Sequence, residues 1–221
     1  SAGGGPRYAL VDLSHSNWIT ISQVDTLQAL LVEYNCTLRY ALDWKELEDL
    51  IEDAELLIIP TPWSIYRPEE VELIANYTEN GGRVLLLYDP SAGWALFANT
   101  VASRLGFSFS EGYLYNLVEN FGNYRNVYAY PAANHPIVAN VSRVLFFTAA
   151  HVYTSGRAIL ATSNSTVLST SEMEGSYVPL ACTDSVIALA DQTILGEPFA
   201  LQEDNWILLS NIIEYLLRER P

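Results

Sequence analysis

The segment Ala54–Pro90, AELLIIPTPWSIYRPEEVELIANYTENGGRVLLLYDP, contains the pattern that decides the fold of this 221-residue chain. Two continuous apolar runs, Glu55–Pro60 and Arg83–Tyr88, are typical of strands that are buried on both faces of a parallel sheet. Between them, Pro68 is followed by two glutamates, a favourable helix start because acids lie near the positive end of the helix dipole. Gly81 predicts the end of that helix. The segment therefore predicts a β–α–β unit.

The same alternation of strands and helices extends to both sides of this segment. The strands expected there are Tyr8–Asp12 and Thr37–Leu42, and the helices are Gln23–Tyr34, Trp44–Asp53 and Ala92–Leu105. Strands that alternate with helices form parallel sheets whose crossover connections are right-handed. The first half of the chain therefore predicts an α/β fold with a doubly wound, mostly parallel sheet.

The sequence changes character near residue 107. The stretch Phe107–Tyr130 is rich in aromatic residues, Asn and Gly, which indicates irregular strands and loops. The later elements expected are strands at Val144–Phe147, Ala158–Thr162, Val178–Ala181 and Ser185–Ala190, and a final helix at Asn205–Arg218. Because no linker or repeat separates the halves, we expect one domain over residues 1–221, whose irregular, β-rich second half continues the sheet.

The net charge of −15 at pH 7, with a single lysine, limits the partners of this chain. Such an acidic surface repels the phosphates of nucleic acids and the anionic head groups of membranes. In addition, no apolar run approaches the roughly 18 residues that are needed to cross a bilayer. We therefore expect no nucleic acid as a partner and no direct membrane insertion within this chain.

Three features together favour an extracellular or cell-surface location. Lysine is rare, and the two cysteines, Cys36 and Cys182, could form one disulfide or remain buried thiols. Four Asn-x-Ser/Thr sequons, the acceptor motif for N-glycosylation, are also present. The sequons begin at Asn35, Asn76, Asn140 and Asn164.

A set of short motifs runs in a fixed order along nearly the whole chain. The motifs are VDLSHSN (Val11–Asn17), Pro60, Pro62, Pro68-Glu69-Glu70, Gly81-Gly82, Asp89-Pro90, NHPIVANV (Asn134–Val141) and DNWILLSNIIEYL (Asp204–Leu216). In these the chain resembles the glutamine-amidotransferase-like (GATase-like) domains of archaeal and bacterial surface proteins. It is also similar to the accessory domains of gliding-motility ABC transporters and of intraflagellar-transport proteins.

The resemblance implies a flavodoxin-like sheet related to class I glutamine amidotransferases and to trehalose-utilisation-type domains. It implies no reaction, because one fold supports many functions. The segment ADQTILG, residues 190–196, departs from the Gly-Asp-Ser pattern of these domains and keeps only Asp191.

The chain lacks the nucleophile of an amidotransferase at the expected position. Such an enzyme places a cysteine at a strand-to-helix turn and backs it with a histidine and an acid. The turn after the strand Arg83–Tyr88 reads DPSAG, with Ser91 but no cysteine. The Gly-x-Ser-x-Gly motif, the histidine spacings of zinc sites and a glycine-rich phosphate loop are missing as well. We therefore predict no cofactor, no metal, and a binding domain rather than an enzyme.

Polar and aromatic side chains follow several expected strands, at the edge where open α/β sheets bind ligands. The candidate ligand-binding residues are Asp12, Ser14, His15, Asn17, Trp63, Asp89, Ser91 and Trp94. We expect His15 either to be oriented by Asp12 or Asp89 or to bond the backbone of a loop. Trp63 and Trp94 either line a crevice for a sugar or another polar solute, or pack under the loops.

Other titratable residues are expected to be structural. The acid pairs Glu48-Asp49 and Glu69-Glu70 fall on predicted helices, where we expect solvated side chains or partners of the helix dipole. His135 precedes a proline and should fix a turn, whereas His151 has no evident partner in the sequence.

Three functions fit these observations. The first is a noncatalytic binding or scaffolding domain of an exported or membrane-anchored protein, whose protein partner is a membrane transporter or an envelope component. The second is a module that binds a small, sugar-like solute at the carboxyl edge of the sheet. The third is a hydrolase whose nucleophile is Ser91 or an activated water molecule.

Overall fold

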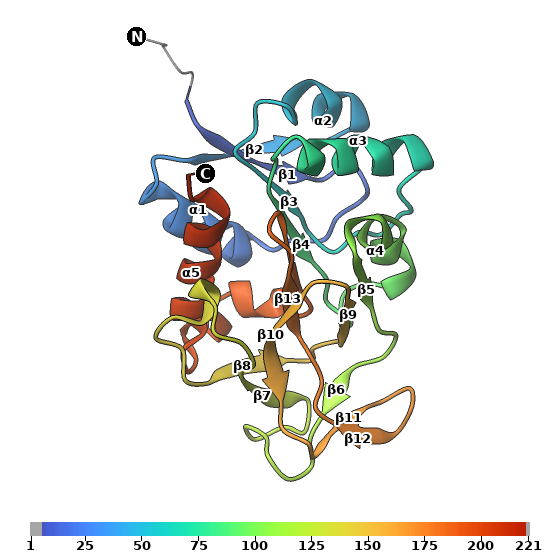
Figure 1. Ribbon diagram of the computed structural model, residues 1–221, viewed down its shortest axis with the longest axis vertical. Helices are drawn as coiled ribbons and strands as arrows, with labels where there is room; N and C mark the ends of the chain where they lie inside the picture. The colour runs from blue at the N-terminus through green and yellow to red at the C-terminus, as the bar shows by residue number, and fades with distance from the viewer. Residues whose placement is uncertain (1–5, 220–221) are drawn as a thin grey trace.

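The computed structural model describes residues 6–219, whose centre is a nine-stranded mixed sheet in the order β2-β1-β3-β4-β14-β13-β10-β7-β8 (Figure 1). Five strands run parallel: β2 (Thr37–Ala41), β1 (Tyr8–Asp12), β3 (Leu56–Ile59), β4 (Val84–Leu87) and β14 (Val186–Leu189). Four strands pair antiparallel: β13 (Leu180–Cys182), β10 (Arg157–Thr162), β7 (Asn126–Pro131) and β8 (Val144–Phe147). The β-rich second half therefore continues the sheet of the first half.

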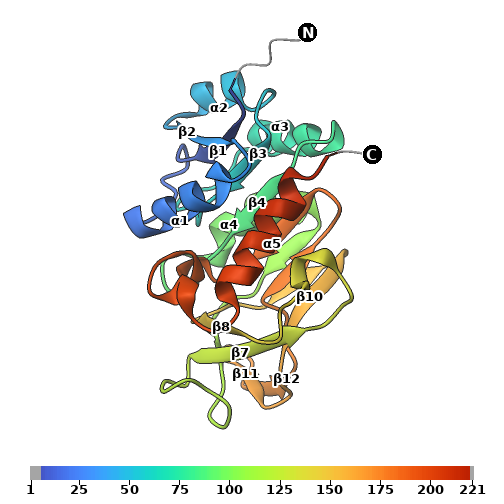
Figure 2. The same ribbon diagram turned by 90° about the vertical axis from the view of Figure 1, so that its left-hand side faces the viewer.

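Helices cover both faces of the sheet (Figures 1 and 2). They are α1 (Ile21–Val32), α2 (Trp44–Leu50), α3 (Pro68–Glu79), α4 (Ala95–Ala102) and α5 (Asn205–Leu217). Because successive side chains of a strand point to opposite faces, Val11 of β1 belongs to the core under α1 and α5, and Leu10 to the core under α2, α3 and α4. The predicted doubly wound α/β fold is confirmed.

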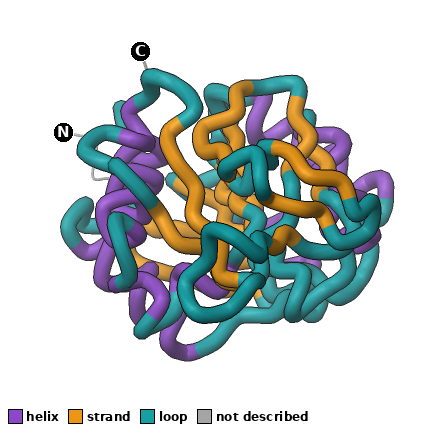
Figure 3. Tube along the Cα trace, turned by 90° about the horizontal axis from the view of Figure 1, so that it is seen from below, coloured by secondary structure: helices purple, strands orange, loops and turns teal. Residues whose placement is uncertain are grey.

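Smaller elements complete the second half, where loops cover much of the end seen in Figure 3. One small sheet has the order β12 (Met173–Gly175), β11 (Thr166–Leu168), β6 (Leu114–Tyr115), and a second pairs β5 (Phe107–Phe109) with β9 (Val152–Thr154). The short 3₁₀ helices are η1 (Ser103–Leu105), η2 (Pro136–Val138), η3 (Gln192–Leu195) and η4 (Phe199–Leu201). This end of the molecule thus consists of short strands and turns, as the composition indicated.

The element α3 begins and ends where its sequence predicts. Pro68 is its first residue, and Gly81 follows it with a φ of 88°, a conformation that glycine adopts without steric cost. By contrast, α4 begins at Ala95, three residues later than expected. The reason is a turn in which the backbone amides of Ala92 and Gly93 both donate to the carbonyl oxygen of Asp89.

The register of the sheet brings the ends of distant strands together. Leu87 of β4 pairs with Leu189 of β14. Asp89 and Asp191, each two residues further along, therefore leave the sheet side by side. The loops after β1 and β3 reach the same edge, because β3 lies between β1 and β4. The candidate site residues all come from this carboxyl edge.

Candidate binding site at the carboxyl edge of the sheet

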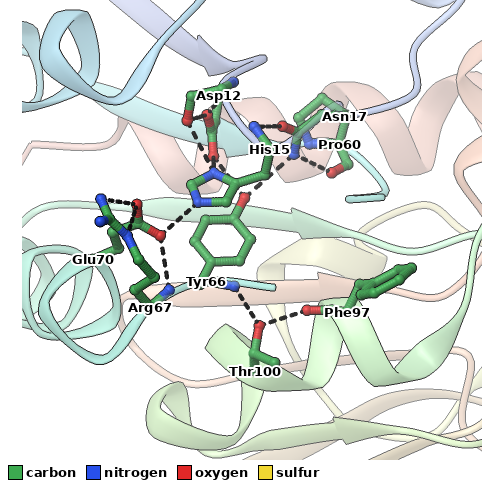
Figure 4. A network of polar contacts seen from close by, with 10 residues as sticks. Asp12, His15, Asn17, Pro60, Tyr66, Arg67, Glu70, Phe97 and Thr100 are labelled. Atoms are coloured by element: carbon green, nitrogen blue, oxygen red, sulfur yellow. Dashed lines mark hydrogen bonds and ion pairs between the residues drawn. The ribbon is translucent and has the colours of Figure 1, made fainter. Parts of the chain in front are cut away.

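The imidazole of His15 lies between two carboxylates (Figure 4). Its Nδ1 is 3.2 Å from Asp12 Oδ2, and its Nε2 is 2.7 Å from Glu70 Oε2. The ring stacks on Tyr66, with centroids 3.6 Å apart, and the Tyr66 hydroxyl donates to Asp12 Oδ2 at 2.6 Å. Only 4% of His15 is exposed. We call Asp12, His15, Tyr66 and Glu70 the histidine cluster.

The charges in the histidine cluster compensate one another. Burial alone would lower the pKa of His15, but the hydrogen bonds and charges of Asp12 and Glu70 raise it overall. Burial would raise the pKa of both carboxyls, yet their bonds to His15 lower it. Arg67, with Nη2 2.9 Å from Glu70 Oε1, adds a second cation. A histidine that is protonated and bonded through both nitrogens has no lone pair with which to act as a general base.

The turn after β1 is built by side chains that bond its backbone. The amide and hydroxyl of Ser14 donate to Asp12 Oδ1 at 2.8 and 2.6 Å, and the amide of His15 donates to Asn17 Oδ1 at 3.0 Å. The Asn17 side chain then donates to the carbonyl oxygen of Pro60 at 2.8 Å. Four of the predicted site residues thus form one unit that is tied to the end of β3.

A second polar cluster follows β4 and β14. Asp89 Oδ2 accepts from the amide and hydroxyl of Thr193 at 3.0 and 2.6 Å, and Asp89 Oδ1 accepts from the amide and hydroxyl of Ser91. Asp191 Oδ1 accepts from the same Thr193 amide at 3.0 Å. Both aspartates are fully buried. Burial, followed by the charge of Asp89, raises the pKa of Asp191 well above its usual value, which favours a neutral Asp191.

Gln192 connects the loops at this edge. Its Oε1 accepts from the amide and the hydroxyl of Thr61, both at 2.8 Å, and its Nε2 donates to the carbonyl oxygen of Trp18 at 2.7 Å and to Gln23 Oε1 at 2.9 Å. The side chain is fully buried, so these bonds form without competition from water. The loops after β1, β3 and β14 are therefore held in one fixed arrangement.

Three aromatic side chains lie on the surface beside these clusters. Trp63 and Trp94 are 44% and 59% exposed, with ring centroids 6.3 Å apart, and Trp94 stacks on Phe97 at 5.8 Å. Thr100 connects Phe97 to the histidine cluster, because its hydroxyl accepts from the amide of Tyr66 at 3.0 Å and donates to the Phe97 carbonyl oxygen at 2.7 Å (Figure 4). We call Trp63, Trp94 and Phe97 the aromatic patch.

The eight predicted site residues are divided among these three groups. Asp12, Ser14, His15 and Asn17 belong to the first unit, Asp89 and Ser91 to the second cluster, and Trp63 and Trp94 to the aromatic patch. Asp12 orients His15, whereas Asp89 bonds Ser91 and Thr193 instead. The acids and His15 are buried, whereas Trp63, Trp94 and Ser91 are exposed.

Sequence reasoning missed several partners in these clusters, above all Tyr66, Glu70 and Thr193. Glu70 is not solvated but buried against His15, and it lies in the first turn of α3, as expected of a partner of the helix dipole. Its place as third residue of a helix is a capping signal, since it accepts from the amide of Arg67. The sequence contains no sign that the loop after β1 would bring His15 to it.

The other two histidines have structural bonds. His135 Nδ1 accepts from the amide of Ile137 and so fixes the start of η2, as predicted. His151, for which the sequence indicated no partner, accepts through Nδ1 from the amide of Val178 at 2.9 Å. Each of these bonds satisfies a backbone donor that would otherwise be left without a partner.

The cysteines are both free and buried, so they are not joined to each other. Cys182 Sγ lies 3.8 Å from Nε2 of His135, but that nitrogen carries the proton of a neutral ring, because Nδ1 is an acceptor. Burial raises the pKa of the Cys182 thiol to about 11. This pair is therefore not an activated nucleophile and base.

Two further findings concern residues 6–219. Within them, no group of three or more His, Cys, Asp or Glu side chains is arranged to hold a metal ion. In the same range, every helix is too short or too polar to cross a lipid bilayer.

No protein-family model and no curated protein matches the sequence. Among solved structures, the chain is similar to the mmIFT52 N-terminal domain, with 15% identity and a TM-score of 0.76 over 97% of this chain and 99% of that chain. It is also similar to a ThuA-like protein from Bacteroides uniformis, with 14% identity and a TM-score of 0.61 over 98% and 93%. Alpha-L-fucosidase isoenzyme 2 from Paenibacillus thiaminolyticus has 16% identity and a TM-score of 0.58 over 98% of this chain and 33% of that chain.

These similarities and the sheet order define the class of fold. The chain has a flavodoxin-like, GATase-like α/β fold, as its motifs implied. At identities of 14 to 16%, the similarities concern the fold alone.

Proposed function

We propose that this chain is a noncatalytic binding or scaffolding domain, and that it holds a protein partner through the aromatic patch. The observation that carries the proposal is the exposure of Trp63 and Trp94 on loops at the carboxyl edge of the sheet, where the buried polar groups bond one another. Tryptophan is enriched among the residues that contribute most to protein interfaces. Gln192 fixes the loop that carries Trp63, and the bonds of Asp89 fix the turn before Trp94, so little conformational entropy would be lost on binding.

The geometry of the polar residues favours binding over catalysis. Nε2 of His15 is engaged by Glu70, and Nδ1 lies 3.2 Å from Asp12 Oδ2 and 2.9 Å from Ser14 Oγ. The hydroxyls of Ser14 and Ser91 donate to Asp12 and Asp89 and not to the imidazole. A serine hydrolase needs its serine hydrogen-bonded to a histidine that can accept the proton. Of the alternatives, the hydrolase hypothesis therefore has the least support.

We further propose that the parent protein is exported or membrane-anchored, and that the partner is a membrane transporter or another envelope component. The acidic composition with its single lysine and the four sequons support this location. The mmIFT52 match is by its title an N-terminal domain, that is, one part of a larger protein. A module of this fold inside a larger protein fits a scaffolding role.

The proposal can be tested by crosslinking the intact parent protein in its own membranes and identifying the captured partner. The double variant Trp63→Ala/Trp94→Ala should reduce capture of that partner at least tenfold, because about 1.4 kcal/mol of lost binding energy is a factor of ten. Met173→Ala is the matched control, since Met173 is 65% exposed on the separate small sheet. Equal capture by the double variant and the control would refute the proposal.

A second candidate is a sugar-like solute as the ligand of the same patch. Flat, exposed rings such as Trp94 stacked on Phe97 offer apolar faces beside polar groups. The fucosidase similarity concerns an enzyme that by its name acts on a sugar, and this chain matches a third of it. Calorimetric titration with a panel of mono- and oligosaccharides distinguishes the two candidates. Saturable heat that is lost in Trp94→Ala would favour the solute.

A further inference from the structure

The four asparagines that begin sequons are more exposed than the other asparagines of the chain. All four are exposed, whereas only three of the ten others are. Those three are Asn80, Asn123 and Asn134. A sequon that arises by chance has no reason to be on the surface more often than any other asparagine, so the two groups differ in a way that composition does not explain.

The two groups also differ in hydrogen bonding. Within residues 6–219, the side chains of the four sequon asparagines make no hydrogen bond, whereas at least eight of the ten other asparagines bond through the side chain. The fold therefore uses most asparagines as structural bridges and leaves the sequon amides free. A free, exposed Nδ2 is what attachment of a glycan requires.

Local structure accounts for two of the sequon asparagines but not for the others. Asn35 and Asn140 have φ values of 51° and 59°, a region that asparagine tolerates better than most residues. Asn76, however, lies on the exposed side of α3, where asparagine is a poor helix former. Asn164 lies at the tip of the turn that the amide of Thr166 closes onto the Ser163 carbonyl at 3.1 Å.

We propose that this chain is N-glycosylated, with Asn76 and Asn164 as its principal acceptors. In the transfer, the side-chain amide loses a proton and its nitrogen bonds the anomeric carbon of an oligosaccharide. The bond from that carbon to a phosphate oxygen of a lipid-linked donor breaks, and the lipid phosphate leaves, so no oxidant or reductant is involved. The inference rests on the exported location proposed above, and not on the aromatic patch.

Glycans on two of the four sequons, at Asn35 and at the principal acceptor Asn76, would leave the aromatic patch uncovered. Asn35 lies just before β2, and Asn76 lies in the last turns of α3, close to the start of β4. Both are therefore at the amino edge of the parallel strands, whereas Trp63 and Trp94 follow the carboxyl ends of β3 and β4. A glycan at either position would limit contacts at the edge opposite to the proposed partner site.

The test is peptide mass mapping of the intact protein isolated from the cells that produce it. Peptides containing Asn76 and Asn164 should carry glycan masses. Asn80, Asn123 and Asn134 are internal controls, because they are exposed but begin no sequon. In the variant Thr78→Ala, which keeps Asn76 but removes its sequon, the modified Asn76 peptide should disappear completely while the Asn164 peptide stays modified.

Two results would overturn the inference. One is the recovery of all four sequon asparagines without modification, and the other is an unchanged Asn76 glycopeptide in Thr78→Ala. Digestion of intact cells with an added protease tests the proposed exported location separately from the glycosylation. A protein that is cleaved at the cell surface yet unmodified would contradict the glycosylation alone, whereas one that is protected inside the cell would contradict both.

Discussion

His15 joins β1 to α3, since Nδ1 contacts Asp12 at the end of β1 and Nε2 contacts Glu70, which is 55 residues further along the chain than His15. Charged groups that are buried together stabilise a fold only when each is paired, and removing one partner leaves an uncompensated charge. In the protonated form of His15, which its raised pKa favours, the order Asp12, His15, Glu70 and Arg67 alternates in sign. The cluster therefore ties the loop after β1 to α3.

The variant Glu70→Gln tests this pairing at the level of one residue. It removes a negative charge next to Nε2, so the pKa of His15 should fall toward its usual value of 6.5. Because folding raises the pKa of His15, protonation of His15 contributes to the stability of the folded state below pH 6.5. This stabilisation is lost as the pH rises through the pKa of the folded state. Glu70→Gln should make the stabilisation smaller. NMR titration of the imidazole measures the shift, and Glu72→Gln, exposed on the same helix, is the control. An unchanged His15 titration in Glu70→Gln would contradict the assignment.

The protonation of Asp191 makes the stability of the fold depend on pH, and Asp191→Asn should abolish this dependence. The folded state binds the Asp191 proton more tightly than the unfolded chain does. The resulting contribution to stability is complete below the usual pKa of 3.8 and is lost as the pH rises through the raised pKa of the folded state. We therefore expect the stability of the wild type relative to Asp191→Asn, measured by urea denaturation, to decrease as the pH rises above the usual value of 3.8. Asp25→Asn, which changes an exposed carboxylate, is the control. A wild-type advantage over Asp191→Asn that stays constant with pH would refute the expectation.

The residues that sequence alone revealed are those with local partners. Asp12, Ser14, His15 and Asn17 lie within six positions, so the end of one predicted strand was enough to group them. Glu70 could not be added, because its approach to His15 depends on the path of the loop after β3. The proximity of Asp89 and Asp191 depends likewise on the pairing of β14 with β4. Such contacts are set by sheet order, which local patterns do not encode.

Gly93 sets how closely two elements approach each other. A Cβ at this position would lie 2.3 Å from Thr61 Cγ2, which is closer than any real contact. Gly93 belongs to the turn between β4 and α4, and Thr61 follows β3, so this glycine allows the loops that carry Trp94 and Trp63 to meet. The spacing of the aromatic patch therefore depends on the lack of a side chain here.

We expect Gly93→Ala to lower the free energy of unfolding by about 1 to 3 kcal/mol, as overpacking typically does. Gly175→Ala is the matched control, because its new Cβ would meet only the Tyr177 ring at an ordinary 3.7 Å. Urea denaturation of both variants measures the effect. A Gly93→Ala protein as stable as Gly175→Ala would mean that the two loops separate without cost.

Elements with strong periodicity and clear caps were predicted well, and those set by turns were not. The strands β3 and β4 and the helix α3 match their expected ranges to within about a residue, because apolar runs, Pro68 and Gly81 mark their ends. The start of α4 was missed, since the Asp89 carbonyl accepts two amides and delays the helix. Strands of two or three residues, such as β6 and β12, are too short to show a period.

The order of strands makes the two halves of the molecule depend on each other. β14, which comes near the end of the chain, lies between β4 of the first half and β13 of the second half. The helix α5 follows it and shares one core with α1. Without β14 and α5, the first half would expose the edge of β4 and the apolar face of α1. Neither half can therefore bury its apolar surface alone, and we expect them to fold together.

This dependence predicts a single cooperative unfolding transition for the whole chain. Hydrogen exchange in increasing urea should give the same opening free energy for the amides of β3 and β4 as for those of β10 and β13, because global unfolding exposes both sets. Tryptophan fluorescence, to which four of the five tryptophans contribute from the first half, should have the same midpoint as circular dichroism. Two separate midpoints, or a chain ending at residue 106 that folds by itself, would show instead that the boundary near residue 107 divides two independent units. The aromatic patch would then be tested in the first unit alone, since both of its tryptophans precede that boundary.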